Sequence, residues 1–177
     1  MDLSDRPVAP NPYDQLPPVP SFTLESTDLT AGQQIAKLFT SPHANVSPHL
    51  SWIGFPDATE SFVVSCFDPD APTPSGYWHW TVIDLDPTVT FLDQGQGQSD
   101  LFLPGAAGHV KTDGGIYGYE GPNPPAGDRP HRYIFAVHAL DVDTLGLDPA
   151  EITPAVAAFT SLFHTIARAT LEVTFAQ

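Results

Sequence analysis

The stretch SFVVSCFDPDAP, residues 61–72, decides the fold of this chain because a strand-like run passes directly into a stiff acidic turn. Residues 61–67 are mostly β-branched, aromatic or small, which is typical of a buried strand. Prolines on both sides of a carboxylate restrict the backbone, so Asp68 and Asp70 are held in place. A second strand-like run, residues 77–85, follows and contains His79. These segments predict two strands joined by a rigid turn that carries two acids.

A second stiff segment, GPNPP at residues 121–125, leads into His131 and a strand-like run over residues 132–140. It belongs to a glycine- and proline-rich segment, residues 112–130, that is long for a connection without secondary structure. Long ordered loops in compact domains are often functional, and its prolines restrict this one. We therefore interpret the two stiff segments as walls of one pocket. The alternative is that both are ordinary turns, since Asp and Pro are common turn residues.

Strands are predicted to predominate elsewhere. Alternating apolar and polar residues indicate strands near residues 22–24, 50–53 and 171–175. One helix is predicted to begin at Thr153, which can cap it, and to end near Arg168, because apolar residues recur at helical spacing between them. This pattern favours a mainly β fold, an antiparallel β-sandwich with one or two short helices near the C-terminus.

The length of 177 residues fits one domain preceded by an arm. Prolines are frequent in the first 20 residues, so residues 1–20 are expected to form a proline-rich, extended and peripheral arm. Residues 21–177 are expected to form the β-sandwich domain.

The composition excludes some classes of partner. Six Lys+Arg against 21 Asp+Glu give a net charge of -15, which argues against nucleic acid and against adhesion to anionic membranes. Cys66 is the single cysteine, so an internal disulfide is excluded. The start of the chain does not resemble a secretion signal, and no apolar run is long enough for a membrane helix. We expect a soluble, cytoplasmic protein.

Strand alternation predicts which side chains share a face. Tyr77 and His79 should lie on one face of residues 77–85, with Trp78 and Trp80 on the other. By the same count, His131 lies on the face of Tyr133. If the three strands are aligned, two carboxylates, two imidazoles and a phenol meet over an apolar floor, as in a small-molecule site.

The expected electrostatics follow from this placement. The carboxylates of Asp68 and Asp70 should raise the pKa of both His79 and His131, so that both rings carry a proton. The charges of these four groups then cancel. Unpaired amides of the glycine-rich loop would make the pocket attractive to a phosphate-sized anion.

These motifs resemble those of the phosphatidylethanolamine-binding protein (PEBP) family, most closely its bacterial Raf-kinase-inhibitor-like branch. The matching elements are the DPDAP stretch, the YWHW stretch at residues 77–80 and the GPxPPxGxxxHRY pattern at residues 121–133. Glu120 and Asn123 depart from what bacterial relatives often carry. The resemblance implies an antiparallel β-sandwich with a small pocket for phosphate, acetate, a phosphorylated small molecule or a phospholipid head group. It also implies a cis peptide bond before Pro72.

The predicted ligand-binding residues are those that match the family's pocket, together with a tryptophan that floors it. They are Asp68, Asp70, His79, Gly121, Pro122, His131, Tyr119, Tyr133 and Trp78. We predict no catalytic residue, cofactor or metal. Family relatives also suggest regulation of kinases or signalling proteins through an unidentified protein partner, and a homodimer.

An enzyme is the alternative function, an Asp/His-dependent or metal-dependent hydrolase. Asp/His pairs can transfer protons, and two aspartates with two histidines can ligate zinc or manganese. The nucleophile is harder to find, because the charge of Asp68 disfavours a Cys66 thiolate. We therefore interpret Cys66 as a small buried residue.

Overall fold

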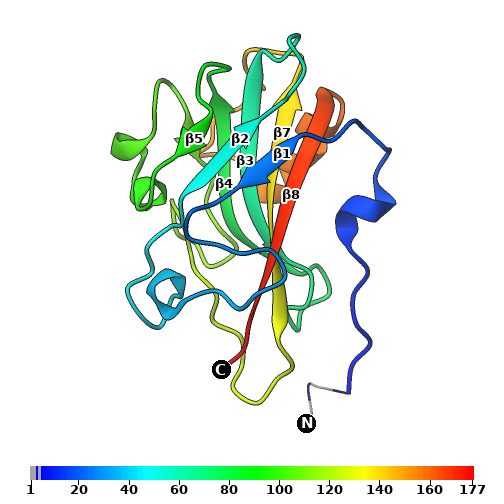
Figure 1. The fold of residues 1–177 in the computed structure, drawn as a ribbon, viewed down its shortest axis with the longest axis vertical. Helices are drawn as coiled ribbons and strands as arrows, with labels where there is room; N and C mark the ends of the chain where they lie inside the picture. The colour runs from blue at the N-terminus through cyan, green and yellow to red at the C-terminus, as the bar shows by residue number, and fades with distance from the viewer. Residues whose placement is uncertain (1–2, 4) are drawn as a thin grey trace.

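The computed structural model describes residues 3 and 5–177 and consists mainly of strands in two antiparallel sheets (Figure 1). The larger sheet has the order β6-β4-β3-β7-β8 and the smaller sheet the order β1-β2-β5. The strands of the larger sheet are β3 (Ser61–Asp68), β4 (Tyr77–Leu85), β6 (Gly108–His109), β7 (His131–Leu140) and β8 (Thr165–Phe175); those of the smaller sheet are β1 (Thr23–Glu25), β2 (Leu50–Ile53) and β5 (Phe91–Leu92). The predicted mainly β, antiparallel fold is confirmed.

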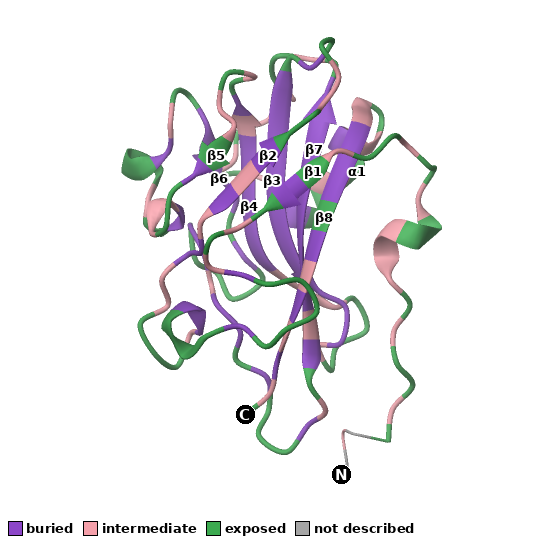
Figure 2. Cartoon of the chain, in the orientation of Figure 1, coloured by how far each residue is buried: buried purple, intermediate pink, exposed green. Residues whose placement is uncertain are grey.

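Strand β3 is the centre of the larger sheet. It pairs with β4 on one side and β7 on the other, and all eight of its residues are buried. Figure 2 shows the central strands buried along most of their length. The main core lies between the sheets and includes Trp52 from β2, Phe62 from β3 and Phe135 from β7. A side chain of this size contributes about 1.5–3 kcal/mol when fully buried.

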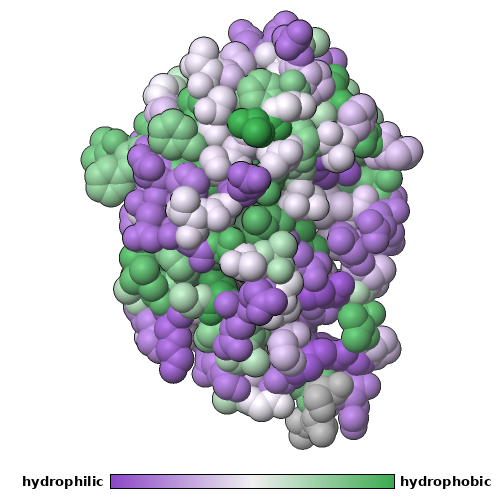
Figure 3. Space-filling view, viewed as in Figure 1, coloured by the Kyte–Doolittle hydropathy of each residue, from purple (hydrophilic) through white to green (hydrophobic). Residues whose placement is uncertain are grey.

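The outer face of the larger sheet is covered by α1 (Pro154–Leu162) and the loop before it. Val63, Ile83 and Leu140 form a second apolar cluster there with Ala157 of the helix. Short 3-10 turns complete the described elements: η1 (Pro12–Gln15), η2 (Lys37–Phe39), η3 (Gln96–Gln98) and η4 (Asp100–Phe102). Figure 3 shows apolar and polar residues interspersed on the face turned toward the viewer. Within the described residues, no helix is long and apolar enough to cross a bilayer.

The predicted helix is real, but its predicted end is wrong. Thr153 caps α1, its side chain accepting a hydrogen bond from the Val156 amide, and the helix stops at Leu162. Arg168 instead lies in β8, which pairs with β7 over nearly its full length. Ten strand pairings with β7 therefore prevail over the helical spacing of apolar residues, which is a local signal.

A β-bulge changes the alternation predicted for β4. Cys66 pairs with Trp80 and Phe67 pairs with Trp78, so His79 is an extra residue without a partner on β3. His79 and Trp80 consequently both face the inner side, Trp80 in the main core and His79 in a pocket. The expectation that Trp80 shares a face with Trp78 is corrected. Bulges occur often near functional sites because they re-aim a side chain.

The N-terminal arm runs along the β8 side of the molecule (Figure 1). The turn η1 interrupts it, so it is not extended throughout. The arm also makes specific contacts: the Arg132 guanidinium donates to the Ala9 carbonyl over 2.6 Å, and Arg6 reaches the loop before β7. The arm thus lies on the outside of the molecule and is attached to it by these hydrogen bonds.

Candidate functional site

A pocket of about 250 Å³ opens at the end of the larger sheet where β3 ends, β4 begins and β7 begins. Two loops close it, the acidic turn after β3 and the proline-rich segment before β7. Its lining residues are Asp68, Ala71, Pro72, Thr73, Tyr77, His79, Glu120, Gly121, Asn123, Pro124, Pro125, His131 and Tyr133. The two stiff segments singled out in the sequence thus meet. Five of the predicted site residues line this pocket: Asp68, His79, Gly121, His131 and Tyr133.

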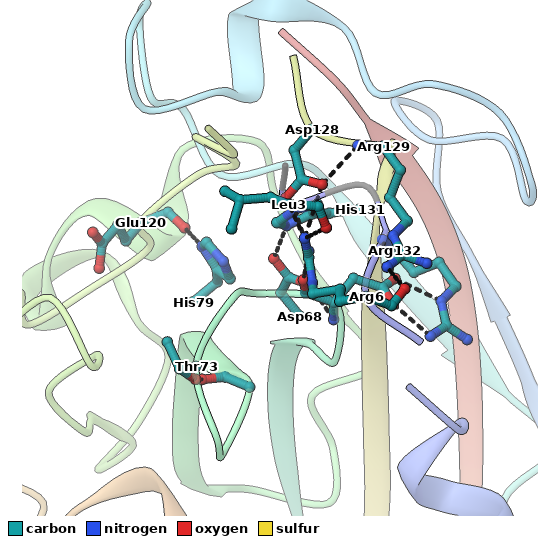
Figure 4. Close-up of polar contacts among 12 residues, drawn as sticks. Leu3, Arg6, Asp68, Thr73, His79, Glu120, Asp128, Arg129, His131 and Arg132 are labelled. Carbon is teal, nitrogen blue, oxygen red and sulfur yellow. Dashed lines mark hydrogen bonds and ion pairs between the residues drawn. The ribbon is translucent and has the colours of Figure 1, made fainter. Parts of the chain in front are cut away.

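His79 presents one ring nitrogen to the protein and the other to the pocket. Its Nδ1 lies 2.7 Å from the Glu120 carbonyl oxygen (Figure 4). A carbonyl only accepts, so Nδ1 carries the hydrogen. Nε2 makes no hydrogen bond to any described residue. Burial lowers the pKa of His79 despite the nearby carbonyl and acids, so the neutral ring has a lone pair on Nε2. The expectation of a raised pKa at His79 is corrected.

His131 lies between two carboxylates. Its Nδ1 is 2.7 Å from Oδ2 of Asp68, and its Nε2 is 2.9 Å from Oδ2 of Asp128. Burial by itself lowers the pKa of His131, but hydrogen bonds with Asp68 and Asp128 and their charges outweigh burial and raise it. Both ring nitrogens face carboxylate oxygens, which favours the imidazolium, and Nη2 of Arg6 also lies 3.2 Å from Nε2. The expected direction of the shift holds here, with Asp128 as a second cause.

Asp128 and Arg6 are site residues that the sequence reasoning missed. The Arg6 guanidinium donates to both oxygens of Asp128, over 2.9 and 2.8 Å, and also to the Asp70 carbonyl. Burial opposes ionisation of Asp128, but hydrogen bonds from His131 and Arg6 lower its pKa to about 2. Figure 4 shows Arg6 among these side chains, with Leu3 of the same arm extending toward His79.

The sequence held one signal for Arg6: basic residues are scarce in this chain, so each is a candidate partner for a buried acid. Its partner could not be named, because Asp128 is far away in the sequence. Nothing local distinguishes Asp128 from other acids in loops.

Asp70 orients the acidic turn and does not line the pocket. Its carboxylate accepts two hydrogen bonds from the Arg132 guanidinium, over 2.7 and 2.8 Å, and one from the Arg132 amide over 3.0 Å. Burial opposes ionisation of Asp70, but these bonds lower its pKa. Its backbone amide donates to Oδ1 of Asp68 over 2.7 Å, so Arg132 positions Asp68 through Asp70.

Most of the acids around the pocket are paired with cationic groups. Three carboxylates, Asp68, Asp70 and Asp128, contact three cationic groups, Arg6, His131 and Arg132. Glu120 adds an acid at the pocket wall, where its carboxylate accepts hydrogen bonds from Tyr77 over 3.1 Å and Thr112 over 2.6 Å. The pocket therefore carries no net positive charge that would attract an anion. A ligand must be recognised through directed hydrogen bonds.

Three other predicted residues lie outside the pocket lining. Tyr119 is buried and its hydroxyl donates to the Phe39 carbonyl over 2.8 Å. Pro122 follows Gly121 in the loop, and its carbonyl accepts from the Ser41 amide over 3.1 Å. Trp78 lies on the opposite face of the sheet, where it lines a different cavity. The expected role of Trp78 as the pocket floor is corrected, because it points away from His79 on the same strand.

Gly121 brings the proline-rich segment close to the segment after η2. A Cβ atom there would overlap the Phe39 carbonyl oxygen and lie 2.9 Å from the Thr40 Cα. The Gly121 amide also donates to the Asn45 side chain over 2.7 Å. Glycine is therefore required for backbone approach rather than for an unusual φ.

The Tyr133 hydroxyl is an unused donor at the pocket wall. Tyr133 is buried, lines the pocket and packs edge-on against His79 with ring centroids 5.1 Å apart. Its hydroxyl makes no hydrogen bond to the part of the chain that is described. Burial and nearby acids raise its pKa, so the hydroxyl keeps its hydrogen.

Three further observations concern the peptide bond before Pro72, the thiol of Cys66 and the arrangement of possible metal ligands. Every peptide bond in the described segments is trans, including the one before Pro72, so the implied cis bond is not seen. Cys66 is buried in the main core, and burial raises the pKa of its thiol. Among residues 3 and 5–177, no group of three or more His, Cys, Asp or Glu side chains is arranged to hold a metal ion.

Comparisons with known proteins agree with the fold and the motifs. The family model for phosphatidylethanolamine-binding protein matches residues 25–176. The chain is 44% identical over 131 residues to the UPF0098 protein YbhB of Escherichia coli K12, covering 74% of this chain and 82% of that protein. The crystal structure of Escherichia coli YbcL, described as a new member of the mammalian PEBP family, has a TM-score of 0.85 at 35% identity and covers 89% of this chain and 99% of that one.

A further solved structure, of a PEBP homologue from Chlamydia trachomatis, has a TM-score of 0.76 at 30% identity and covers 89% of this chain and 98% of that one. The family model spans both pocket-forming loops and every strand of the larger sheet. The chain therefore belongs to the phosphatidylethanolamine-binding protein family.

Proposed function

We propose that the pocket binds a small phosphoryl or carboxyl head group in a singly protonated or ammonium-bearing form. One observation carries this proposal: two atoms that line the pocket and have no hydrogen-bond partner among the described residues, His79 Nε2 and the Tyr133 hydroxyl, have complementary hydrogen-bonding roles. Neutral Nε2 accepts a hydrogen bond, whereas the hydroxyl can donate one. A ligand that offers a donor and an anionic acceptor close together satisfies both.

Phosphate monoesters suit this arrangement. The monoanion carries a P–O–H donor beside P–O oxygens, and phosphoethanolamine carries an ammonium group as well. Phosphoryl oxygens lose their last proton near pH 6 to 7, so the monoanion is available around neutrality. An acid that has lost all its protons offers no donor to His79.

The remaining groups hold this pair in place and do not compete for the ligand. His131 uses both nitrogens for Asp68 and Asp128, and Arg132 is occupied by Asp70. We infer that the protein acts by binding, because the buried Cys66 thiol stays protonated and supplies no nucleophile, and because Nε2 of His79 is assigned here to accept a hydrogen bond from the ligand. Kinase regulation, a protein partner, a homodimer and a cytoplasmic location stay predictions.

Isothermal titration calorimetry with phosphate and sulfate at neutral pH tests the proposal. The two anions are similar in size, but sulfate has no proton to donate. We expect phosphate to bind at least about fivefold more tightly than sulfate, since an unpaired buried polar group costs about 1–3 kcal/mol. Phosphoethanolamine should bind as well as phosphate or better.

Lowering the pH should reduce the difference between the affinities for phosphate and for sulfate. Once His79 is protonated, at a pH below its ordinary value of 6.5, Nε2 becomes a donor and sulfate becomes acceptable. Equal affinity for both anions at neutral pH would contradict the hydrogen-bonding assignment. No heat with either anion from folded protein would contradict anion binding altogether.

A further inference from the structure

A second cavity, of about 260 Å³, lies on the outer face of the larger sheet, beneath α1 and the turn η1 of the arm. We call it the outer cavity. Its apolar lining includes Leu16, Val63, Phe67, Trp78, Ala158 and Leu162. We propose that the outer cavity binds a carboxylic acid with a short apolar tail, at a site separate from the head-group pocket.

Among the residues that line the cavity, Arg168 carries a charge. It lies in β8, is 9% exposed, and lines the cavity. Its Nε donates to Nδ1 of His138 over 3.3 Å, and its Cζ lies 5.3 Å from the Tyr13 ring centroid. No carboxylate of the described residues forms an ion pair with it, although the chain has 21 acidic residues. A buried guanidinium without an anion is a costly arrangement that an anionic ligand relieves.

The side chains next to Arg168 can donate hydrogen bonds and are uncharged. Burial lowers the pKa of His138 to about 3, with Arg168 acting in the same direction, so the ring is neutral. Because Nδ1 accepts from Arg168, the ring hydrogen is on Nε2, which has no partner among the described side chains. The Tyr13 hydroxyl lies 3.4 Å from the Ser65 hydroxyl, and burial raises its pKa to about 12. The end of the cavity at Arg168 is therefore bordered by one positive charge and by hydroxyl and ring N–H groups.

A carboxylate matches this end better than a phosphate. It carries one negative charge and two coplanar acceptor oxygens, which suit a guanidinium fork. A phosphate dianion would leave a second charge without a partner inside an apolar cavity, which is unfavourable. The size of the cavity is slightly below the range of pockets for drug-sized ligands, so the tail must be short.

Octanoate is the probe and octan-1-ol, with the same tail and no charge, is its control. Calorimetry on the full chain at neutral pH should give binding of octanoate at least about tenfold tighter than octan-1-ol, the lower bound for a charged hydrogen bond. Arg168→Gln should reduce octanoate affinity by at least about tenfold and leave octan-1-ol unchanged. Circular dichroism of each variant checks that it folds.

Ala158→Leu tests the location independently of charge. Leucine fits the helix and fills the cavity, so both probes should lose binding. His79→Ala, in the other pocket, should leave octanoate binding unchanged. The inference is overturned if wild-type protein binds octanoate no better than octan-1-ol, if Ala158→Leu has no effect, or if His79→Ala abolishes octanoate binding. The wild-type comparison and Ala158→Leu decide the matter even if Arg168→Gln fails to fold.

Discussion

The Nδ1 atom of His131 lies 2.7 Å from Oδ2 of Asp68, so the first residue of β7 is tied to the last residue of β3 inside the sheet. On its other side the same ring contacts Asp128 of the proline-rich segment. One imidazolium thereby joins the two stiff segments that form the pocket.

Replacing Tyr133 by phenylalanine should weaken phosphate binding without affecting folding. The hydroxyl has no partner among the described residues, so its removal costs the ligand one hydrogen bond, about 0.5–1.5 kcal/mol or up to roughly tenfold in affinity. Calorimetry and thermal unfolding measure the two effects. Tyr119→Phe is the matched control, because its hydroxyl bonds the Phe39 carbonyl: it should lower stability by about 1 kcal/mol and leave affinity unchanged. An exchange of these two outcomes would contradict the assignment.

The stability lost in His131→Gln should depend on pH. The folded pKa of His131 is raised above 6.5, so its contribution is fully present below pH 6.5 and is lost as the pH rises through the folded value. The difference in unfolding free energy between wild type and variant should therefore be largest in weakly acidic solution and shrink toward alkaline pH. Urea denaturation across this range measures it. Groups that do not contact His131, such as His138, cancel in the difference, and a difference that does not vary with pH would refute the imidazolium.

Arg6 and Asp128 should be energetically coupled. Arg6→Gln leaves the fully buried Asp128 carboxylate with His131 as its remaining side-chain partner, which should cost about 1–3 kcal/mol. Asp128→Asn removes the charge that Arg6 neutralises. In the double variant the loss should be smaller than the sum of the single losses, as a double-mutant cycle measures. Additive losses of unfolding free energy would mean that the ion pair between Arg6 of the arm and Asp128 of the pocket loop is not formed in solution.

Gly121→Ala should displace the proline-rich segment. The added methyl group meets the Phe39 carbonyl, which is backbone and cannot turn aside, so both stability and phosphate affinity should fall. Gly127→Ala in the same segment is the control. Its Cβ meets no atom within 4 Å, but its φ of +78° strains alanine by about 1–2 kcal/mol. This control should lose stability and retain affinity; equal loss of affinity in both variants would show that general loosening of the loop is responsible.

Local patterns were sufficient for the two stiff segments and for the longer strands, but they missed β5, β6 and the first half of β8. Alternation predicted residues 171–175 as a strand, and the prolines marked both loops of the pocket. Such patterns do not identify which strands pair with each other. The end of α1 depends on β8 pairing with β7, and the outward position of Trp78 relative to Trp80 depends on a bulge opposite β3.

The network of ion pairs beside the pocket was the part of the site that the sequence predicted least. Arg6 and Asp128 are 122 residues apart, and ion pairs at such separations leave no periodic signal in the sequence. The sign of the pKa shift at His79 was also missed, because it depends on how deeply the ring is buried. Depth of burial is a property of the packed structure rather than of the neighbouring residues.

The extra residue in β4, His79, faces the same side of the sheet as Trp80, which follows it. Deleting His79 would restore strict two-residue periodicity and leave Tyr77, Trp78 and Trp80 on the faces they already occupy. The pocket would then lose the imidazole beside Tyr133, although its other lining residues stayed in the sequence. The bulge thus adds an inward-facing side chain to the pocket without moving its neighbours to the other face.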